Sequence, residues 1–274
     1  MSHTLAKTKL AVLGGGKMGG ILLQAFLQSG VVPKRNLRAT VAHSERAIGL
    51  SKQLQIPVTV DNRQAVSESE IILICVKPQA VAEVLESIGS ELDRNRLVVS
   101  VAASVPTSYI EERVPPKVPV VRAMPNTPAM VGAGVTAISG GSSATTHNLQ
   151  IASHLFDTVG KTVVVDEKHM DAVTGLSASG PAFLYIVLES LAEAGVKVGL
   201  PRDLATLLAA QTMLGAGKVV LETGNHPALL KDAVTTPAGC TIDGILELEE
   251  GKLRVTLIKA VVKATQRAKE LLFC

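Results

Sequence analysis

The sequence predicts an α/β domain with a doubly wound parallel sheet over residues 1–166, followed by an all-α domain over residues 167–274. Three observations support this division. Apolar runs of strand length alternate with helical patterns through the first half, a glycine-rich turn follows the first run, and strand patterns end near residue 167. The length of 274 residues exceeds the usual size of one domain, which also favours two.

Strands and helices are expected in alternation along the first domain. Strands are predicted at residues 9–13, 36–43, 58–60, 69–78, 96–104, 118–126 and 161–165, and helices at residues 17–29, 44–54 and 80–89. The segment 69–78 is apolar almost without interruption, as is typical of a strand covered on both faces. Right-handed crossovers between such strands produce a parallel sheet.

The turn after the first strand consists of Gly14, Gly15, Gly16, Lys17, Met18 and Gly19, and it matches the pattern G-x-G-x-x-G. In this pattern the first glycine allows a tight turn, the second lets a pyrophosphate approach the backbone, and the third lets helix and strand pack closely. Free N–H groups at the helix start attract the anion. A glycine-rich turn without a ligand is the alternative, but the flanking strand and helix favour a dinucleotide site.

The end of the second strand indicates which dinucleotide binds. A site for NAD usually carries Asp or Glu there to hold the ribose hydroxyls, whereas this strand ends at Ala42 and is followed by Ser44 and Arg46. A hydroxyl and a guanidinium suit the 2′-phosphate of NADPH. Glu45 leaves weaker use of NADH open, and an ordinary solvated helix start is the alternative interpretation.

Carboxyl ends of strands face the ligand crevice of an open α/β sheet. Candidates for cofactor contact at three such ends are Val76, Lys77 and Pro78, then Ala102 and Ala103, then Asn126 in the segment 124–128. The small side chains of Ala102 and Ala103 would let a flat nicotinamide ring lie against the backbone. An exposed charge at Lys77 and a stiffened turn at Pro125 and Pro128 are the alternatives.

The second half is helical and apolar. Helices are predicted at residues 180–199, 200–224, 241–251 and 252–272. The helix at 200–224 is apolar on nearly all sides, so it must be buried. A domain of this size does not readily cover such a helix, which favours packing against a partner subunit; burial within one subunit is the alternative.

The loop "TTPAGCTIDG", residues 235–244, carries no charge before Asp243. Its last part opens a predicted helix, so the N–H groups of Gly239, Cys240 and Thr241 form a candidate site for a carboxylate or phosphate. A simple helix cap at Thr241 is the alternative. In a protein that already binds a dinucleotide, the loop predicts a small anionic substrate.

Composition excludes several classes of partner. Aromatic residues make up 2% of the chain, Trp is absent, and the net charge is +3 without a basic tract, so nucleic-acid binding is not expected. No apolar run of about 18 to 20 residues is apparent, so no membrane span is expected. His147 and His154 are expected at the surface, and no metal site is predicted.

The three cysteines, Cys75, Cys240 and Cys274, are far apart and form no CxxC pair. This usage suits a reducing compartment. The N-terminal segment lacks the apolar core of a secretory signal. A cytoplasmic location is therefore expected.

A family resemblance extends along nearly the entire chain. The segments "GGGKMG", "CVKPQ", "SVAAS", "RAMPNTPAMVGAG", "TGLSASGPAF", "EAGVKVGLPRDLA", "HPALLKDAVTTPAGCTIDG" and "LEEGKLR" occur in the order seen in pyrroline-5-carboxylate reductases, which this chain resembles. It departs from the family pattern at Ala178, Ala238 and Ser104, where glycine is usual, and at Cys240 and Ala133. Each departure adds or changes bulk near the expected site.

The resemblance implies NADPH-dependent reduction of L-1-pyrroline-5-carboxylate to L-proline, the last step of proline biosynthesis. It also implies a Rossmann-type NADP-binding domain, a helical dimerisation domain, and a homodimer, often assembled into a decamer, with an active site shared between two subunits. By the matching motifs, Asn62 and Cys75 join the cofactor contacts above, and Thr174, Thr236, Gly239, Cys240 and Thr241 would bind the substrate. The Thr241 hydroxyl would face the ring nitrogen as the catalytic group.

Other functions stay open to different degrees. A β-hydroxyacid dehydrogenase shares this plan but needs a catalytic lysine on the first long helix of the second domain, and residues 176–196 contain none. A non-catalytic NADPH-binding regulatory protein and a reductase of a related cyclic imine remain alternatives. An imine nitrogen is basic enough to bind already protonated, which agrees with the uncharged loop at 235–241.

Overall fold

The computed structural model describes residue 5 and residues 7–270. The chain forms two compact units. Unit 1 contains the described parts of residues 1–178 and 264–274, and unit 2 contains residues 179–263. The predicted domain boundary near residue 167 remains a prediction, and each unit is described below by itself.

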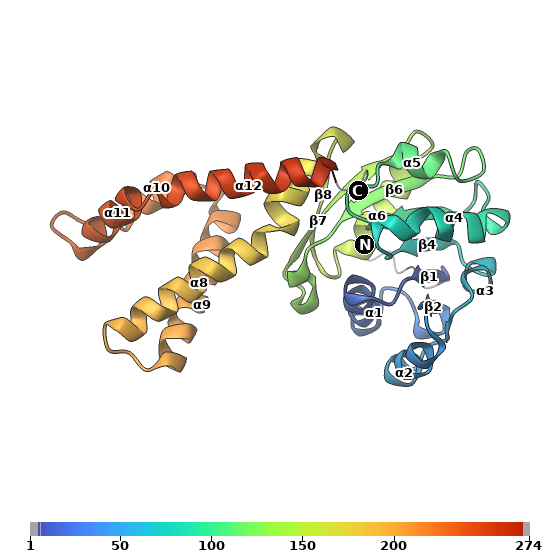
Figure 1. The fold of residues 1–274 in the computed structure, drawn as a ribbon, viewed down its shortest axis with the longest axis horizontal. Helices are drawn as coiled ribbons and strands as arrows, with labels where there is room; N and C mark the ends of the chain where they lie inside the picture. The colour runs from blue at the N-terminus through green and yellow to red at the C-terminus, as the bar shows by residue number, and fades with distance from the viewer. Residues whose placement is uncertain (1–4, 6, 271–274) are drawn as a thin grey trace. The chain divides into compact units, whose positions relative to one another are not determined.

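Unit 1 is built on one sheet of eight strands in the order β3-β2-β1-β4-β5-β6-β7-β8 (Figure 1). The strands are β1 (Leu10–Leu13), β2 (Leu37–Thr40), β3 (Val58–Thr59), β4 (Ile71–Ile74), β5 (Leu97–Ser100), β6 (Val120–Met124), β7 (Gly134–Gly140) and β8 (Gly160–Val164). All neighbours are parallel except β6 and β7. The order in which successive strands are added reverses between β1 and β4, which lie parallel, and such switch points are where these sheets bind ligands.

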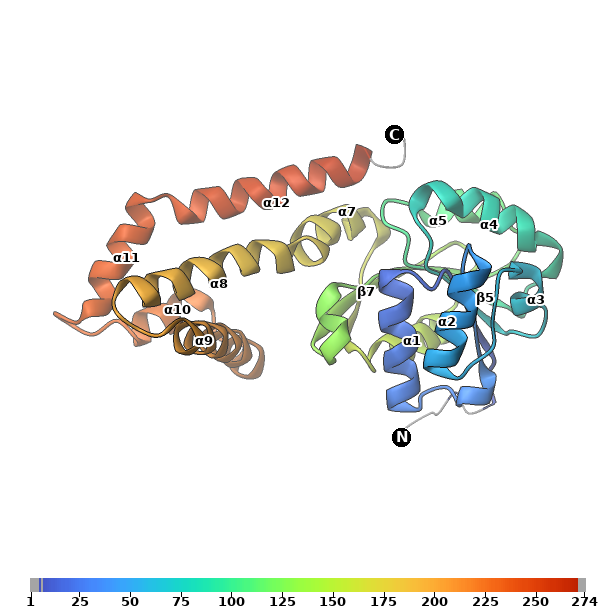
Figure 2. The same cartoon turned by 60° about the horizontal axis from the view of Figure 1, so that its bottom comes forward.

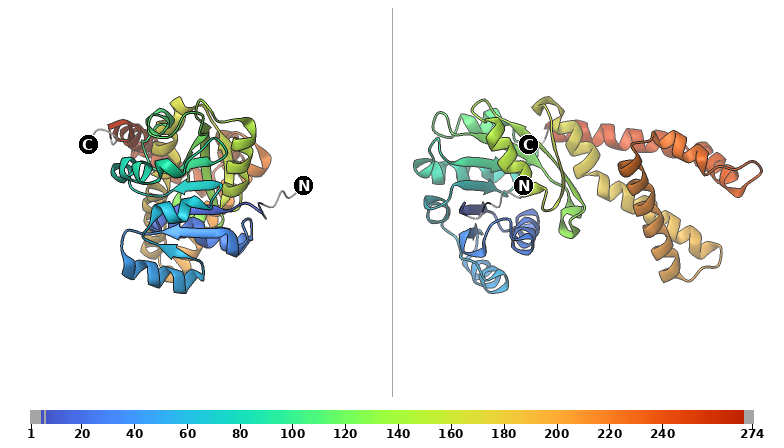
Figure 3. Two further views of the ribbon diagram at one scale, coloured as in Figure 1. Left: turned by 90° about the vertical axis from the view of Figure 1, so that its right-hand side faces the viewer. Right: turned by 180° about the vertical axis from the view of Figure 1, so that it is seen from behind.

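Helices cover both faces of this sheet (Figure 3). Side chains of α1 (Lys17–Ser29) and α6 (Thr146–Phe156) pack on one face, and those of α3 (Asn62–Ser67), α4 (Val81–Ile88) and α5 (Thr107–Glu111) pack on the other. Helix α2 (Ser44–Leu54) follows β2. The central strands β1 and β4 are buried at every position, because both of their faces are covered.

The predicted α/β fold is confirmed, with local exceptions. Every predicted strand and helix of the first half forms, but β7, α3, α5 and α6 were not predicted. The expectation of a fully parallel sheet is wrong for β6 and β7. Only residues 125–133 separate these two strands, too few for a crossover helix, so the chain returns antiparallel.

Unit 2 is helical (Figure 2). It contains α8 (Gly180–Lys197), α9 (Arg202–Thr223), α10 (Pro227–Ala233), α11 (Cys240–Glu250) and the first part of α12 (Leu253–Glu270). Helix α10 was not predicted, and the last two residues predicted for the final helix lie outside the described part. Among the described residues of unit 2, the buried apolar side chains are those of Ala192, Ala205 and Ala209, whereas many leucines and isoleucines are exposed. One copy of this unit therefore lacks a core of its own.

Two helical segments, residues 167–197 and 202–223, are long and apolar enough to cross a membrane by length and composition. The expectation that no apolar segment reaches the length of a membrane span is wrong, because few charged residues interrupt these two segments. Length and composition do not distinguish a helix that faces lipid from one that faces another protein chain.

Candidate functional site

The glycine turn between β1 and α1 needs glycine at its first and third motif positions. Gly14 has φ +104°, and a Cβ there would lie 2.8 Å from the carbonyl oxygen of Cys75. A Cβ on Gly19 would overlap the carbonyl oxygen of Gly14. The absence of side chains thus allows both the sharp turn and the close packing of α1 against it.

Gly16 differs from these two glycines. A Cβ on Gly16 would meet nothing within 4 Å, so the fold itself does not require glycine here. Gly16 is the N-cap of α1 and supplies no side-chain cap to its N–H groups. The turn therefore presents a bare backbone and the positive end of a helix dipole to open space, which fits a pyrophosphate.

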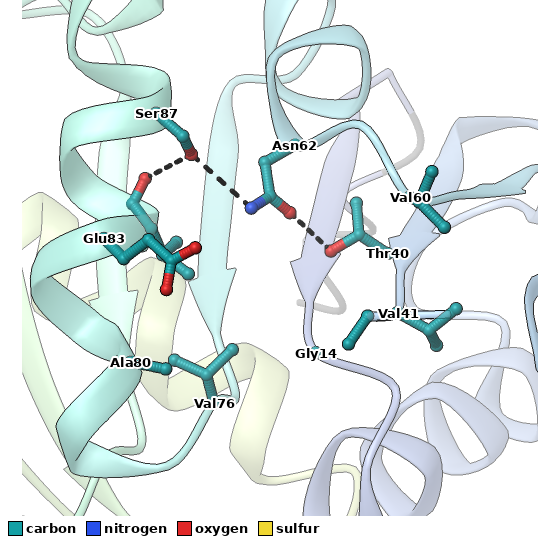
Figure 4. Close-up of a pocket in the computed structure, with 11 residues that line it drawn as sticks. Gly14, Thr40, Val41, Val60, Asn62, Val76, Ala80, Glu83 and Ser87 are labelled. Carbon is teal, nitrogen blue, oxygen red and sulfur yellow. Dashed lines mark hydrogen bonds between the residues drawn. The ribbon is translucent and has the colours of Figure 1, made fainter. Parts of the chain in front are cut away.

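A cavity of about 300 Å³ lies beside the turn (Figure 4). It is lined by Gly14, Thr40, Val41, Ala42, Val60, Asn62, Val76, Ala80, Glu83, Val84 and Ser87. The Thr40 hydroxyl donates to Oδ1 of Asn62 at 2.7 Å, and Nδ2 of Asn62 donates to the Ser87 hydroxyl at 3.5 Å. This chain of hydrogen bonds joins β2, α3 and α4 and holds Asn62 at the wall of the cavity.

The start of α2 carries the residues predicted to bind a 2′-phosphate. Ser44 is the first residue of the helix, its N-cap His43 makes no side-chain cap bond, and Ser44 and Arg46 are exposed. Nη2 of Arg46 donates to the carbonyl oxygen of Gly15 at 2.8 Å. The guanidinium therefore lies beside the glycine turn, and its other N–H groups, which have no partner among the described residues, are available to an anion.

The ends of β4 and β5 hold the other predicted cofactor contacts. Val76 lines the cavity, Lys77 is exposed, and Pro78 begins a short 3-10 helix (η2, Pro78–Ala80). Burial raises the pKa of the Cys75 thiol, which keeps it protonated. Ala102 is buried and Ala103 is partly exposed, so only methyl side chains follow β5 at these two positions.

Asn126 and Thr174 lie in segments that the structure ties together. The Asn126 side chain accepts from the N–H of Val135 at 2.9 Å and donates to the carbonyl oxygen of Ser177 at 3.1 Å. Thr174 opens a π-helical turn (η6, Thr174–Ala178), and its hydroxyl donates to the carbonyl oxygen of Met170 at 2.8 Å. Both ends of the Asn126 amide are therefore engaged within the protein.

The loop before α11, in unit 2, presents backbone N–H groups as expected. Helix α11 begins at Cys240, its N-cap is Gly239, and no side chain caps it. The alternative in which Thr241 simply caps the helix is wrong, because the helix begins at Cys240 with Gly239 as its N-cap, which places Thr241 inside the first turn. The Thr241 side chain is exposed, and among the described residues its hydroxyl has no hydrogen-bond partner.

Thr236 and Gly239 explain the tight shape of this loop. The N–H of Gly239 donates to the carbonyl oxygen of Thr236 at 3.0 Å, and a Cβ on Gly239 would overlap the Thr236 hydroxyl. Ala238 adopts φ +55°, a conformation that residues with a side chain seldom adopt. The loop thus exposes peptide groups and hydroxyls rather than charges.

Sequence reasoning did not identify several residues of the cavity. Thr40, Glu83 and Ser87 line it, and the first and last of these join the hydrogen bonds that orient Asn62. Thr40 lies at the carboxyl end of β2, within a predicted strand, and residues at such ends face the ligand crevice, so its position could have identified it. Ser87 carried no signal, because α4 reaches the cavity only through the packing of the fold. Among the described residues, no cluster of metal-ligating side chains is found.

These features define a Rossmann-type dinucleotide-binding protein with a second, helical unit. Comparison with protein families agrees on both parts. Residues 9–104 match a model described as "NADP oxidoreductase coenzyme F420-dependent", and residues 167–271 match one described as "Pyrroline-5-carboxylate reductase dimerisation".

Relatives match along the whole chain. The pyrroline-5-carboxylate reductase of Methanosarcina acetivorans is 44% identical, over 96% of this chain and 97% of its own length. That of Glycine max is 42% identical, over 96% of this chain and 95% of its own length. A solved structure of the enzyme from Coxiella burnetii has a TM-score of 0.88 at 32% identity and covers 96% of this chain and 98% of its own. The chain belongs to the pyrroline-5-carboxylate reductase family.

Proposed function

We propose that this protein reduces L-1-pyrroline-5-carboxylate to L-proline with NADPH, the last step of proline biosynthesis. The observation that carries the proposal is the match to named reductases at 44% identity over both the cofactor half and the helical half. The bare glycine turn at Gly16 and the uncharged loop at 235–241 support the proposal, because they would supply the cofactor site and the substrate site that this reaction needs.

The cofactor site is assigned to unit 1. The turn at Gly14–Gly19 would hold the pyrophosphate, and Ser44 with Arg46 would hold the 2′-phosphate. The cavity beside Asn62 would take the adenosine, and the surface at Ala102 and Ala103 the nicotinamide. A relative from Plasmodium falciparum, 29% identical with a TM-score of 0.87 over 97% of this chain, was solved with NADP bound. When bound, NADPH supplies the hydride for the imine carbon.

The substrate site is assigned to the loop before α11. The N–H groups of Cys240 and Thr241 would hold the substrate carboxylate at a helix start. The Thr241 hydroxyl, which has no partner among the described residues, would accept a hydrogen bond from the protonated ring nitrogen. Because the substrate brings this proton, the chain needs no acidic side chain here, and it acts mainly by holding the imine carbon in place.

The helices of unit 2 are assigned to the interface of a homodimer. The matched dimerisation model covers them, and their exposed leucines and isoleucines would be covered by a second copy. Assembly into a decamer and an active site shared between subunits are further predictions. A cytoplasmic location is proposed from the scattered cysteines.

The experiment is a turnover assay with the purified protein and L-1-pyrroline-5-carboxylate, in which oxidation of NADPH and NADH is followed separately. We expect substrate-dependent oxidation of both, with a lower KM for NADPH. Folded protein that binds NADPH without oxidising it would point to the non-catalytic alternative, and turnover of a six-membered cyclic imine in preference would assign a different substrate.

A further inference from the structure

Asn126 follows β6 and is almost fully buried. Its carboxamide connects the N–H of Val135 to the carbonyl oxygen of Ser177, which lies 51 residues away in the sequence. Because a backbone N–H can only donate, Val135 requires Oδ1 on its side, and Nδ2 must face Ser177. The direction of this bridge is therefore determined by chemistry.

The Ser177 carbonyl needs an outside donor because of the sequence that follows. In an α-helix a carbonyl accepts from the N–H four residues later, and that residue is Pro181, which has none. Ser177 lies in the π-helical turn Thr174–Ala178, a rare conformation that is frequent at functional sites. The N–H five residues later, the partner expected in a π-helix, is that of Ala182, and it donates to the carbonyl oxygen of Ser179 at 3.0 Å instead. Asn126 thus supplies the hydrogen bond that Pro181 removes.

The turn held by Asn126 packs beside the expected nicotinamide surface. Ala103 and Ala178 both pack against the buried cluster of Met124, Ala137 and Met170. A second tie joins the segment before this turn to the start of α5, because the Glu167 carboxylate accepts from the N–H of Thr107 at 2.7 Å. The segment that carries Thr174 is therefore fastened to the loops that follow β5 and β6.

We propose that Asn126 is a positioning residue, which fixes the turn Thr174–Ala178 through the Ser177 carbonyl and so places Thr174 to bind the substrate. This inference rests on the proposed function. It assigns Asn126 an indirect role in place of the predicted cofactor contact.

The first test compares Asn126→Ala and Asn126→Asp with Asn148→Ala. Asn148 is a matched control because its Oδ1 also accepts a backbone N–H, that of Thr145 at 2.8 Å, in a cap far along the chain from this turn. A partly buried carbonyl left without its donor predicts a fall in kcat/KM for the imine of roughly 5- to 100-fold at Asn126, with the Kd of NADPH unchanged within about twofold. Asn148→Ala should keep wild-type kcat/KM.

Two results would overturn the positioning role. If Asn126→Ala raises the Kd of NADPH and retains kcat, Asn126 contacts the cofactor directly, as first predicted. If Asn126→Ala lowers Tm and retains kcat, Asn126 only stabilises the fold. Asn126→Asp keeps the acceptor for Val135, so it provides a folded variant if Asn126→Ala does not fold.

A double-mutant cycle with Pro181→Ala tests the route through Ser177. Alanine restores an N–H four residues after Ser177, so Asn126→Ala should cost a smaller factor in kcat/KM in the Pro181→Ala background than in the wild type. Equal factors in both backgrounds would contradict the route.

Hydrogen exchange separates this inference from the proposed function. Peptides covering residues 174–180 should exchange faster in Asn126→Ala whether or not the imine is the substrate. Faster exchange without any wild-type turnover of the imine would refute the proposed function alone, whereas unchanged exchange would refute the anchoring by Asn126.

Discussion

Nη2 of Arg46, in the first turn of α2, donates a hydrogen bond of 2.8 Å to the carbonyl oxygen of Gly15 in the glycine turn. A residue predicted from the sequence to choose between NADPH and NADH is therefore also a support of the turn that both cofactors would use. This double role changes what its substitution should do.

Arg46→Asp should raise KM for both cofactors, and more for NADPH. Loss of a charged hydrogen bond to the 2′-phosphate should raise KM for NADPH about 10- to 150-fold. Loss of the bond to Gly15 should raise KM for NADH roughly 2- to 10-fold. Lys52→Asp, at the other end of the same helix, is the control for charge. Steady-state kinetics with each cofactor measures this, and unchanged constants for NADPH would remove Arg46 from the phosphate site.

Gly16→Ala should weaken cofactor binding without harming the fold. Its Cβ meets nothing within 4 Å of the protein but enters the space assigned to the pyrophosphate, so the Kd of NADPH should rise about tenfold or more. Gly20→Ala, also open, is the control and should bind normally. Fluorescence titration together with Tm measures both effects, and normal binding by Gly16→Ala would place the pyrophosphate elsewhere.

Thr241→Ala should lower kcat and leave stability nearly unchanged. The hydroxyl caps no helix, so little folding free energy depends on it, while a lost bond to a charged nitrogen corresponds to about 10- to 150-fold in rate. Thr256→Ala, an exposed threonine on α12, is the control. Normal kcat in Thr241→Ala would exclude the catalytic role.

Ile186→Asp should disrupt the dimer. Ile186 on α8 is 64% exposed in one chain, and a carboxylate in an apolar interface costs several kcal/mol unless it is paired. Ile48→Asp on α2, where isoleucine is 72% exposed, is the matched control and should keep the wild-type mass. Light scattering coupled to size-exclusion chromatography distinguishes them. A dimer of Ile186→Asp with wild-type stability would place the interface on other residues.

Ser104→Gly should stabilise unit 1. Ser104 is buried, adopts φ +64°, and its hydroxyl has no hydrogen-bond partner among the described residues. Relief of the left-handed conformation, less the added chain entropy of glycine, predicts a gain of about 0.5 to 1 kcal/mol relative to Ser104→Ala, which keeps the strained Cβ. Urea unfolding of both variants measures the difference, and equal stability would mean that the conformation is not strained.

Strongly patterned elements could be predicted from the sequence, and weakly patterned ones could not. Strand β4 was predictable because its apolar run is continuous, and α2 because helical spacing follows Ser44. The antiparallel β7 was missed because its alternation of small residues resembles a loop, and its partner β6 decides its direction. Likewise, Thr241 could be chosen as a site residue, but its place inside the first turn of α11 follows from where the backbone turns at Gly239.

The sequence by itself determined the strongly patterned strands and helices, the glycine turn, and the uncharged loop before α11, because these depend on local periodicity and on the absence of side chains. The tertiary structure alone decided which distant residues meet. Packing brings Ser87 of α4 to Asn62, Arg46 to Gly15, and Asn126 to Ser177. Such contacts arise when helices close over a sheet, and their partners are separated by 25, 31 and 51 residues, so no local pattern records them.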